Sequence, residues 1–335
     1  MPSWVRDRVV PCLDDKRDEA VAALFFNITV TTVPAAIALY VLPPSHLLGA
    51  AYVVANLVTF LQRFILGLHC VEHRRLFKPD SALGWFHHVP NKVFAPLFGI
   101  PAGMYRLHHI IMHHTENNLI GYDLSSTEPF QRDNFFHFLF YWVRFWVAAW
   151  IELPYYALRR KRFDVFADVA AVEVSFVGLV YALNRSNPVP TLYVFVIPFF
   201  IASFALMLGN WCQHALINPA KPRSNFGLTV NCLNSFDNRR TFNDGYHIVH
   251  HSNSKLHWTE MPQRFLDTMD KHREEDAWAF VGVSFMEVGV ACMLGKYKWV
   301  AGKLATMPGT KRPSDDEIVA EIKLRLQPIR QVKAK

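Results

Sequence analysis

Histidines gather at a few places in this sequence of 335 residues, which contains sixteen of them. Spacings of three or four residues place side chains on one face of a helix, so such side chains can bind a common ion. Imidazole is a ligand for zinc, copper, iron and nickel. The positions with this spacing, together with one asparagine, are His69 and His73; His109, His113 and His114; Asn210 and His214; and His247, His250 and His251.

These nine histidines are too many for one ion, which takes about three to five such ligands, and they suit two ions. His114 points elsewhere than its neighbour His113 on a helix and could serve the second ion. His108 fits the helical spacing less well than His109. The clusters lack the Glu-x-x-His helices of soluble di-iron bundles, so the sequence predicts a different, nitrogen-rich site.

The remaining histidines favour structural roles. A histidine alone beside an aromatic residue usually makes a packing hydrogen bond, which is the expectation for His46, His137 and His272. A structural role is also favoured for the adjacent His87 and His88, and the role of His257 stays open.

Composition indicates a membrane protein with a substantial polar part, because 51% of the residues are hydrophobic while 19% are charged. The net charge of +7 is typical of cytoplasmic loops that obey the positive-inside rule. No basic stretch interleaved with aromatic residues indicates a nucleic-acid partner. The five cysteines form no C-x-x-C pair, so neither a disulfide framework nor a thiolate zinc site is expected. Cys70 and Cys212 lie inside histidine motifs and are expected to pack as small apolar residues.

Four apolar runs have about the length needed to cross a bilayer, roughly 20 residues. A short uncharged joint, Pro43 to His46, predicts that the first two runs form a hairpin, and the last two are expected to form another. The expected fold is therefore an all-α integral membrane protein, a single domain over 1–335, with a cytosolic helical cap and tail over 210–335 that helps hold the histidines. The predicted spans are 20–42, 47–68, 165–183 and 191–209.

A fifth stretch, 135–151, is rich in aromatic residues and contains Arg144, which favours the membrane interface. The number of membrane crossings also supports a flat position for 135–151. Histidine clusters that share a site must lie on one side of the membrane, so the chain must cross it an even number of times between His114 and Asn210. Three apolar stretches lie there, so one of them must not span. A sixth apolar stretch, 277–294, carries Glu287 near its middle. Residues 314–326 are expected to form a closing amphipathic helix, with Ser314 and Glu317 spaced as a capping box.

The ordered motifs resemble those of the membrane fatty acid desaturase and hydroxylase superfamily. The resemblance covers roughly 20–290. The matching motifs are H-x-x-x-H from His69 to His73, H-x-x-x-H-H from His109 to His114, N-x-x-x-H from Asn210 to His214, and G-Y-H-x-x-H-H from Gly245 to His251.

The resemblance implies two iron ions held by the nine histidines, with Asn210 contacting one iron through a water. It also implies O2 as co-substrate and a fatty acyl substrate, as a free acid, acyl-CoA or acyl-lipid. The second motif has three residues between its first two histidines, His109 and His113, whereas two are common in acyl-CoA desaturases. The subfamily and the substrate therefore stay open. No His-Pro-Gly-Gly occurs, so electrons are expected from a separate carrier such as cytochrome b5 or ferredoxin with its reductase.

An unactivated methylene has no acidic proton, so its oxidation belongs to iron and O2 rather than to acid–base catalysis. Double-bond formation is favoured, while hydroxylation and oxidative decarboxylation to a terminal alkene stay open. The active site is expected on the cytosolic side of a multi-pass protein, in the endoplasmic reticulum or a bacterial inner membrane. Basic residues near the motifs, such as Arg63, Arg74, Arg75 and Arg106, could hold an anionic headgroup or simply be solvated.

Two rival functions fit less well. A zinc-dependent membrane lipid hydrolase needs about three histidines and a carboxylate, for which Glu72 is the candidate, but it leaves most histidines unexplained. A metal transporter should carry its ligands near the middle of its spans, whereas these histidines lie at span ends.

Overall fold

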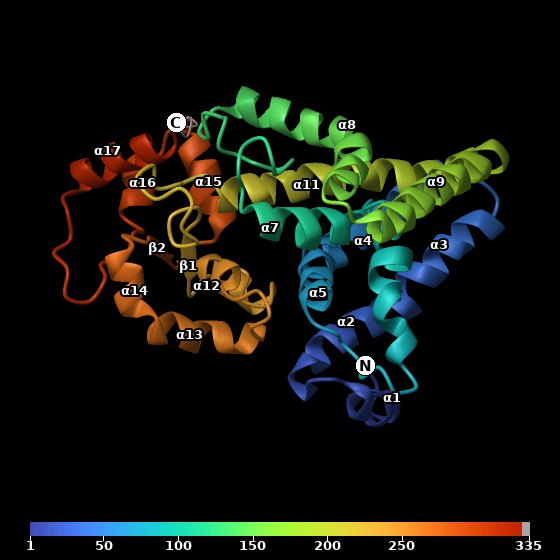
Figure 1. The fold of residues 1–335 in the computed structure, drawn as a ribbon. Helices are drawn as coiled ribbons and strands as arrows, with labels where there is room; N and C mark the ends of the chain where they lie inside the picture. The colour runs from blue at the N-terminus through green and yellow to red at the C-terminus, as the bar shows by residue number, and fades with distance from the viewer. Residues whose placement is uncertain (330–335) are drawn as a thin grey trace. The chain divides into compact units, whose positions relative to one another are not determined.

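The computed structural model describes residues 1–329, and the chain divides into two compact units (Figure 1). The first unit comprises Met1–Ile110 and Trp150–Phe204, and the second comprises Ile111–Ala149 and the chain from Ala205 onward. Each unit combines two stretches, so neither is a continuous sequence domain. Three helices continue from one unit into the other: η6 Arg106–His113, α8 Phe135–Arg159 and α11 Ile197–Gln213.

The first unit consists mainly of long apolar helices, of which α2 packs against α5 and α3 against α4. Its α-helices are α1 Ser3–Val9, α2 Glu19–Val30, α3 Thr32–Val41, α4 His46–Asn56, α5 Gln62–His73, α6 Ala95–Leu97, α9 Phe163–Ser186 and α10 Pro188–Thr191. Shorter π or 3₁₀ segments are η1 Val10–Cys12, η2 Lys16–Asp18, η3 Leu57–Leu61, η4 Gly84–His88, η5 Pro90–Phe94 and η7 Leu192–Val196.

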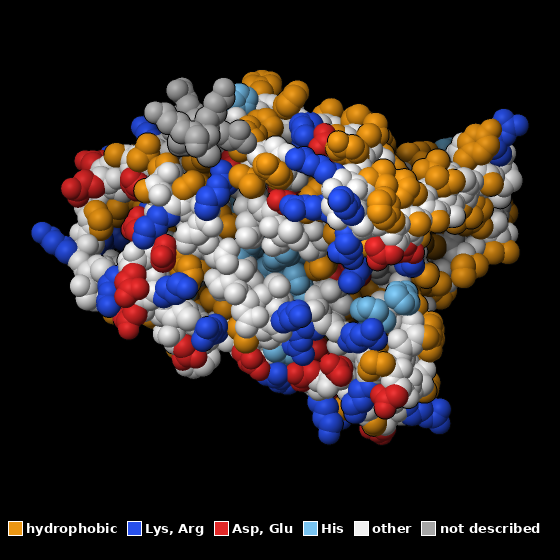
Figure 2. Space-filling model, viewed as in Figure 1, with side chains coloured by type: hydrophobic (Ala, Val, Ile, Leu, Met, Phe, Trp, Pro, Cys, Tyr) orange, Lys and Arg blue, Asp and Glu red, His pale blue; other side chains and the backbone are white. Residues whose placement is uncertain are grey.

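Four helical segments are long and apolar enough to cross a membrane, which confirms the expected number of candidate spans. Figure 2 shows hydrophobic side chains over α9, whereas charged side chains gather over α13 and α14 of the second unit. The hairpin arrangement and the cytosolic position of the remaining chain stay predictions. The four segments are Lys16–Val41, His46–His73, Phe163–Ser186 and Pro188–Gln213.

A buried polar cluster ties the helices of the first unit together. The hydroxyl of Thr32 donates to Oδ1 of Asn56 over 2.8 Å, and Nδ2 of Asn56 donates to the carbonyl of Leu97 over 3.2 Å. An unpaired amide in an apolar surrounding costs about 2–7 kcal/mol. These hydrogen bonds therefore fix α3, α4 and α6 in one register.

Gly99 lets the 90–102 segment approach the start of α11. Its φ is 78°, a left-handed conformation that favours glycine, and a Cβ there would collide with the backbone of Pro198. The segment therefore lies directly against the helix that ends near His214.

Helix α8 contains the stretch 135–151 and is not among the four candidate spans. Its exposed apolar side chains recur three or four residues apart, at Phe136, Phe140, Val143 and Val147. Arg144, which lies beside this stripe, donates from Nη1 to the carbonyl of Leu124 over 2.9 Å. An exposed apolar stripe suits the membrane interface, and the flat position of α8 stays a prediction.

The second unit is a cluster of short helices around a small two-stranded sheet (Figure 1). Its elements are α7 His114–Glu116, β1 Asn231–Leu233, η8 Asp237–Arg239, α12 His247–Ser252, η9 Trp258–Glu260, α13 Met261–Asp267, α14 Met269–Glu274, β2 Ala279–Val281, α15 Phe285–Met293, α16 Tyr297–Ala301 and α17 Asp315–Arg325.

The chain is mostly helical, as expected, and this small sheet is its one departure from an all-α fold among the described residues. Strands β1 and β2 pair in parallel, with Asn231 opposite Ala279. Each strand has three residues, too few for an alternating pattern to be visible in the sequence. The apolar stretch 277–294 is accordingly not one helix, because Ser284 and Glu287 form a capping box that begins α15.

The C-terminal helix confirms the predicted capping box. Helix α17 begins after Ser314, whose side chain accepts the N–H of Glu317, while the Glu317 carboxylate accepts the N–H of Ser314. Its apolar side packs into the main core of the second unit through Ile318, Ile322 and Leu326.

Arg132 is fully buried and connects three segments of the second unit. Its guanidinium donates to the carbonyls of Ala215, Arg325 and Gln327 over 2.8, 2.8 and 2.5 Å, and to three carbonyls within 127–130. Arg132 also accepts the indole N–H of Trp211 at its carbonyl over 3.0 Å. One charged side chain thus joins the end of α11, the segment after the second histidine motif and the end of α17.

Substitution Arg132→Met should strongly destabilise the protein, because it leaves several buried carbonyls without donors. Each orphaned group costs about 1–3 kcal/mol, so the melting temperature of the detergent-solubilised protein should fall by roughly 10 °C. The matched control is Arg240→Met, which removes an exposed arginine of the same unit. Equal melting temperatures for the two variants would contradict this role for Arg132.

Candidate metal site

In the first unit, the expected ligands His69, His73 and His109 lie together. Their ring centroids are 4.9 Å (His69–His73), 4.5 Å (His69–His109) and 5.3 Å (His73–His109) apart. One ligand atom from each ring lies within 4.8 Å of those of the other two. His69 and His73 come from the last turns of α5, and His109 comes from η6.

One contact to this trio and one ion pair beside it in sequence involve residues of the same two helical segments and Tyr105. The ring of Tyr105 stacks on His109, with centroids 5.2 Å apart and planes 27° apart. Glu72, inside the first motif, is buried and accepts a hydrogen bond from Nη1 of Arg106 over 2.9 Å. Arg106, proposed from the sequence as a possible headgroup contact, is therefore paired with a carboxylate.

Helix η6, which carries the second motif, is a π-helix. Its i→i+5 hydrogen bonds make a wider turn than those of an α-helix, and such segments are frequent at functional sites. On this helix His109 and His114 belong to one group of converging ligand atoms and His113 belongs to another. The sequence spacing alone could not reveal this helix type.

In the second unit, His113, His214 and His251 form a compact group. Their ring centroids lie 5.2–5.4 Å apart, and one ligand atom from each lies within 4.8 Å of those of the others. His214 and His113 are almost wholly buried, at 0% and 1% exposure. The group combines residues from η6, from the chain just after α11 and from α12.

Hydrogen bonds at Nδ1 orient two of these rings. Nδ1 of His113 donates to Oδ2 of Asp123 over 2.7 Å, and Nδ1 of His214 donates to the carbonyl of Leu228 over 3.1 Å. A neutral imidazole that donates at Nδ1 presents its lone pair at Nε2. Nε2 of His214 is indeed buried without a hydrogen-bond partner among the described residues. A metal ion would satisfy this atom.

Burial also favours the uncharged forms of His214 and His251. Desolvation, reinforced by the neighbouring His113, lowers the pKa of His214 to about 3. Desolvation and the neighbouring histidines lower the pKa of His251 well below its usual value. Metal ions bind the unprotonated form of imidazole, so the pKa directions favour ligation.

Two further pairs bring imidazole nitrogens close together. The Nε2 atoms of His114 and His250 are 2.9 Å apart, and those of His247 and His251 are 3.2 Å apart. Metal–imidazole bonds are about 2.0–2.1 Å long, so neighbouring nitrogens on one ion lie about 3 Å apart. These pairs thus have the separation of two ligands on one ion.

Asp123, which sequence reasoning missed, anchors the second motif. Its carboxylate accepts the hydrogen bond from His113 and also bonds from the N–H of Asn118 and from the N–H and hydroxyl of Ser125. Carboxylates behind metal-bound histidines are a recurring arrangement. The only signal in the sequence was an aspartate in the polar segment that follows the histidines.

The two-stranded sheet positions the third motif. Asn231 of β1 accepts the N–H of Ile248 at its Oδ1 over 3.0 Å, which satisfies a free donor at the start of α12. Its Nδ2 donates to Nε2 of His272 over 3.0 Å, and Nδ1 of His272 donates to the carbonyl of Thr268 over 2.9 Å. His272 thus makes the packing hydrogen bonds expected of it and helps orient the asparagine.

Gly245 begins the third motif at a crowded position. A Cβ there would collide with Oδ1 of Asn238 and the carbonyl of Cys232. The glycine N–H donates to that Oδ1 over 3.0 Å, and the Asn238 amide in turn donates to the Cys232 carbonyl over 2.9 Å. Only glycine leaves room for this close approach, which sets the path of the chain into α12.

Asn210 lies one helical turn before His214, and its carbonyl accepts the N–H of His214 over 3.0 Å. Its side-chain Nδ2 donates to the hydroxyl of Tyr141 over 2.7 Å and to the carbonyl of Ser125 over 3.0 Å. These bonds hold the amide against α8 and the segment that follows the second motif. Its contact with an iron through water stays a prediction.

The other histidines fall outside these groups, as far as the described residues go. His46 and His137 make the expected hydrogen bonds, with the Tyr193 hydroxyl over 3.1 Å and the Gln131 N–H over 3.0 Å. His257, left open by the sequence, accepts the N–H of Thr259 at Nδ1 over 3.2 Å and begins η9. Neither His87, His88 nor His108 joins a group of converging ligands.

The comparisons with known proteins give one match. The family model described as fatty acid desaturase matches residues 22–280. That stretch contains all nine expected ligand histidines and Asn210. No curated protein and no solved structure matches the chain.

Substitution Gly245→Ala should displace the third motif, because the added methyl collides with two buried oxygens. We expect a loss of bound metal larger than that caused by Gly209→Ala, whose added methyl meets nothing within 4 Å. Metal content, measured by elemental mass spectrometry on monodisperse protein, checks this. Equal metal content in both variants would show that the close approach is unimportant.

Proposed function

The chain belongs to the fatty acid desaturase family, and we propose that it is an O2-dependent di-iron oxidase that introduces a double bond into a fatty acyl chain. Membership implies an oxidoreductase of the membrane. The observation that carries the proposal is the group His113, His214 and His251, whose buried ligand atoms converge within 4.8 Å. The histidine trio of the first unit, His69, His73 and His109, supports a second ion.

The residues fit two irons in number and chemistry. Each trio offers three imidazole nitrogens, and His114, His250 and His247 supply three more at ligand-like separations. Imidazole suits iron. When bound, reduced iron with O2 supplies an oxidant able to break an unactivated C–H bond.

The chain's own residues hold this site in place and bury part of it. Asp123 and the Leu228 carbonyl fix two rings so that Nε2 faces the proposed ion. His214 is fully buried and His250 is 3% exposed, so the surrounding protein excludes water from these two rings. His73, His109 and His114 are partly exposed.

The electron balance of desaturation requires an external electron donor. Desaturation removes two hydrogen atoms, and reduction of O2 to two waters takes four electrons and four protons. The acyl chain provides two of each, so two electrons must come from outside and two protons from solvent. We therefore propose a separate donor, cytochrome b5 or ferredoxin with its reductase, that reaches the site from the cytosolic side.

The alternative activities would use either the same two-iron site or a zinc site with fewer histidines. Hydroxylation and oxidative decarboxylation would proceed on the same irons and differ in product. A zinc hydrolase would need a free carboxylate as base, but Glu72, the candidate, accepts a hydrogen bond from Arg106. The pairing of Glu72 disfavours the hydrolase.

Protein expressed with ample iron should bind two irons per chain, and His214→Gln should lower this to about one, because that ring supplies one of the converging nitrogens. His250→Ala should likewise lose metal and activity. The matched control, His137→Gln, alters a histidine outside both groups and should retain two irons. Clearly fewer than two metals in the unsubstituted protein, or zinc in place of iron, would contradict the di-iron proposal.

Expression in a host of defined lipid composition should produce lipids two mass units lighter, each with one additional double bond. Mass spectrometry of total lipids, with localisation of the double bond, measures this. An added hydroxyl or a terminal alkene one carbon shorter would assign the hydroxylase or the decarboxylase instead. Unchanged lipids from iron-loaded protein with an active reductase would argue against all three activities.

A further inference from the structure

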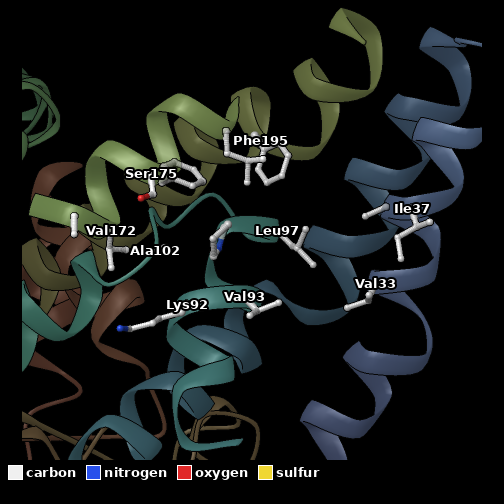
Figure 3. Close-up of a pocket in the computed structure, with 14 residues that line it drawn as sticks. Val33, Ile37, Lys92, Val93, Leu97, Ala102, Val172, Ser175 and Phe195 are labelled. Carbon is white, nitrogen blue, oxygen red and sulfur yellow. The ribbon is translucent and has the colours of Figure 1, made fainter. Parts of the chain in front are cut away.

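A long apolar groove of about 580 Å³ lies within the first unit (Figure 3). Helix α9 contributes one face to it, through Ala171, Val172, Ser175 and Leu179. The opposite walls come from α3 and from the 90–102 segment (Figure 3). Its volume lies in the usual range for ligand sites, about 300–1,000 Å³.

Small side chains create this groove. Ala36 of α3, Ala102, and Ala171 and Ser175 of α9 line it where larger residues would close it. The lining residues of α9 run from Ala171 to Leu179, which at 1.5 Å per residue is about 12 Å of helix. The groove is therefore elongated along a candidate span and suits a single hydrocarbon chain.

One end of the groove is charged. Lys92 lines it, and Nζ of Lys92 lies 3.1 Å from Oδ1 of Asp168, one turn before Ala171 on α9. Both side chains are accessible, at 38% and 65% exposure. An exposed ion pair of this kind contributes little, about 0–1 kcal/mol, so its charges remain available to a ligand. Ser175 is the other polar side chain of the lining, and its hydroxyl is drawn in Figure 3.

We propose that this groove binds one acyl chain of a zwitterionic glycerophospholipid, with the phosphate at Lys92 and the cationic amine of the headgroup at Asp168. Helices α3 and α9, which line two sides of the groove, lie within candidate spans, so bilayer lipid is the apolar material available to fill it. The paired charges select the headgroup. A free fatty acid would bring its carboxylate beside Asp168, and a neutral lipid would satisfy neither charge.

The site goes beyond the proposed oxidase function, because lipid binding here needs neither iron nor an electron donor. The groove nevertheless lies close in sequence to the metal site of the same unit. Ala102 at its charged end is three residues before Tyr105, whose ring stacks on His109. Bound lipid would thus support the segment that leads into η6.

Photo-crosslinking of the full chain in nanodiscs, without added iron, tests the proposal. The probes are phosphatidylcholines with a diazirine either near the acyl carboxyl or near the acyl terminus. The first probe should label peptides around Ala102 and Val172, and the second those around Ile37 and Leu179. Labelling spread evenly over all lipid-exposed helices would overturn the proposal, since annular lipid would then explain it.

Ser175→Trp should fill the groove and reduce labelling about tenfold. Its matched control is Val174→Trp, a residue on the same helix that is 74% exposed and does not line the groove. Equal labelling in the two variants would overturn the site. If Ser175→Trp does not yield monodisperse protein, Ala171→Met provides the same comparison.

The double substitution Lys92→Gln and Asp168→Asn keeps the groove and removes its charges. Phosphatidylcholine labelling should again fall about tenfold, whereas a neutral diacylglycerol probe should be unaffected. Oleic acid should compete poorly with phosphatidylcholine in the unsubstituted protein. Efficient competition by oleic acid, or unchanged labelling in the double variant, would overturn the choice of headgroup. Because none of these readouts uses iron, failure here leaves the oxidase proposal untouched, and failure of the oxidase proposal leaves this one standing.

Discussion

The histidine group of the second unit depends on hydrogen bonds that two of its buried imidazoles donate at Nδ1. These bonds point away from the other histidines of the group. A neutral ring has one donor and one acceptor nitrogen, so occupying Nδ1 with an acceptor directs the lone pair of Nε2 the other way. Asp123 does this for His113, and the Leu228 carbonyl does it for His214. Without these acceptors the rings could rotate or change tautomer, and the convergence of ligand atoms would be lost. The histidine group is therefore organised by acceptors that are not among the proposed ligands.

The acceptors themselves are held by a wider network. Asp123 belongs to a segment whose Thr127 hydroxyl donates to the carbonyl of His214 over 2.8 Å, which links the second motif to the end of α11. Arg132 adds the end of α17 through the carbonyls of Arg325 and Gln327. Helix α17 lies beyond residues 22–280, the part that the family model matches. A region outside the shared family sequence thus helps to stabilise the histidine group.

The features that the sequence predicts are local ones. Apolar runs of bilayer length, the Ser314–Glu317 capping box and the turn spacing of the histidines all depend on residues within a few positions of one another. The features it missed depend on distant pairs. The β1–β2 pairing joins residues 48 positions apart, because Asn231 lies opposite Ala279, and Asp123 has an ordinary place in a polar loop. No periodic pattern marks such pairs, so the sequence could not predict the small sheet that positions the third motif.

The second motif shows why residue spacing must be considered together with helix type. In an α-helix, backbone bonds join residues four apart, so residues three and four positions on flank the first one. In a π-helix the bonds join residues five apart, so residues four and five positions on take those flanking places. His113 and His114 are four and five residues after His109, and η6 is a π-helix. This motif has three residues between its first two histidines instead of two. The wider turn of the π-helix matches that extra residue. On an ordinary α-helix this spacing would rotate His114 away from His109, whereas on the π-helix His113 and His114 take the places that flank His109.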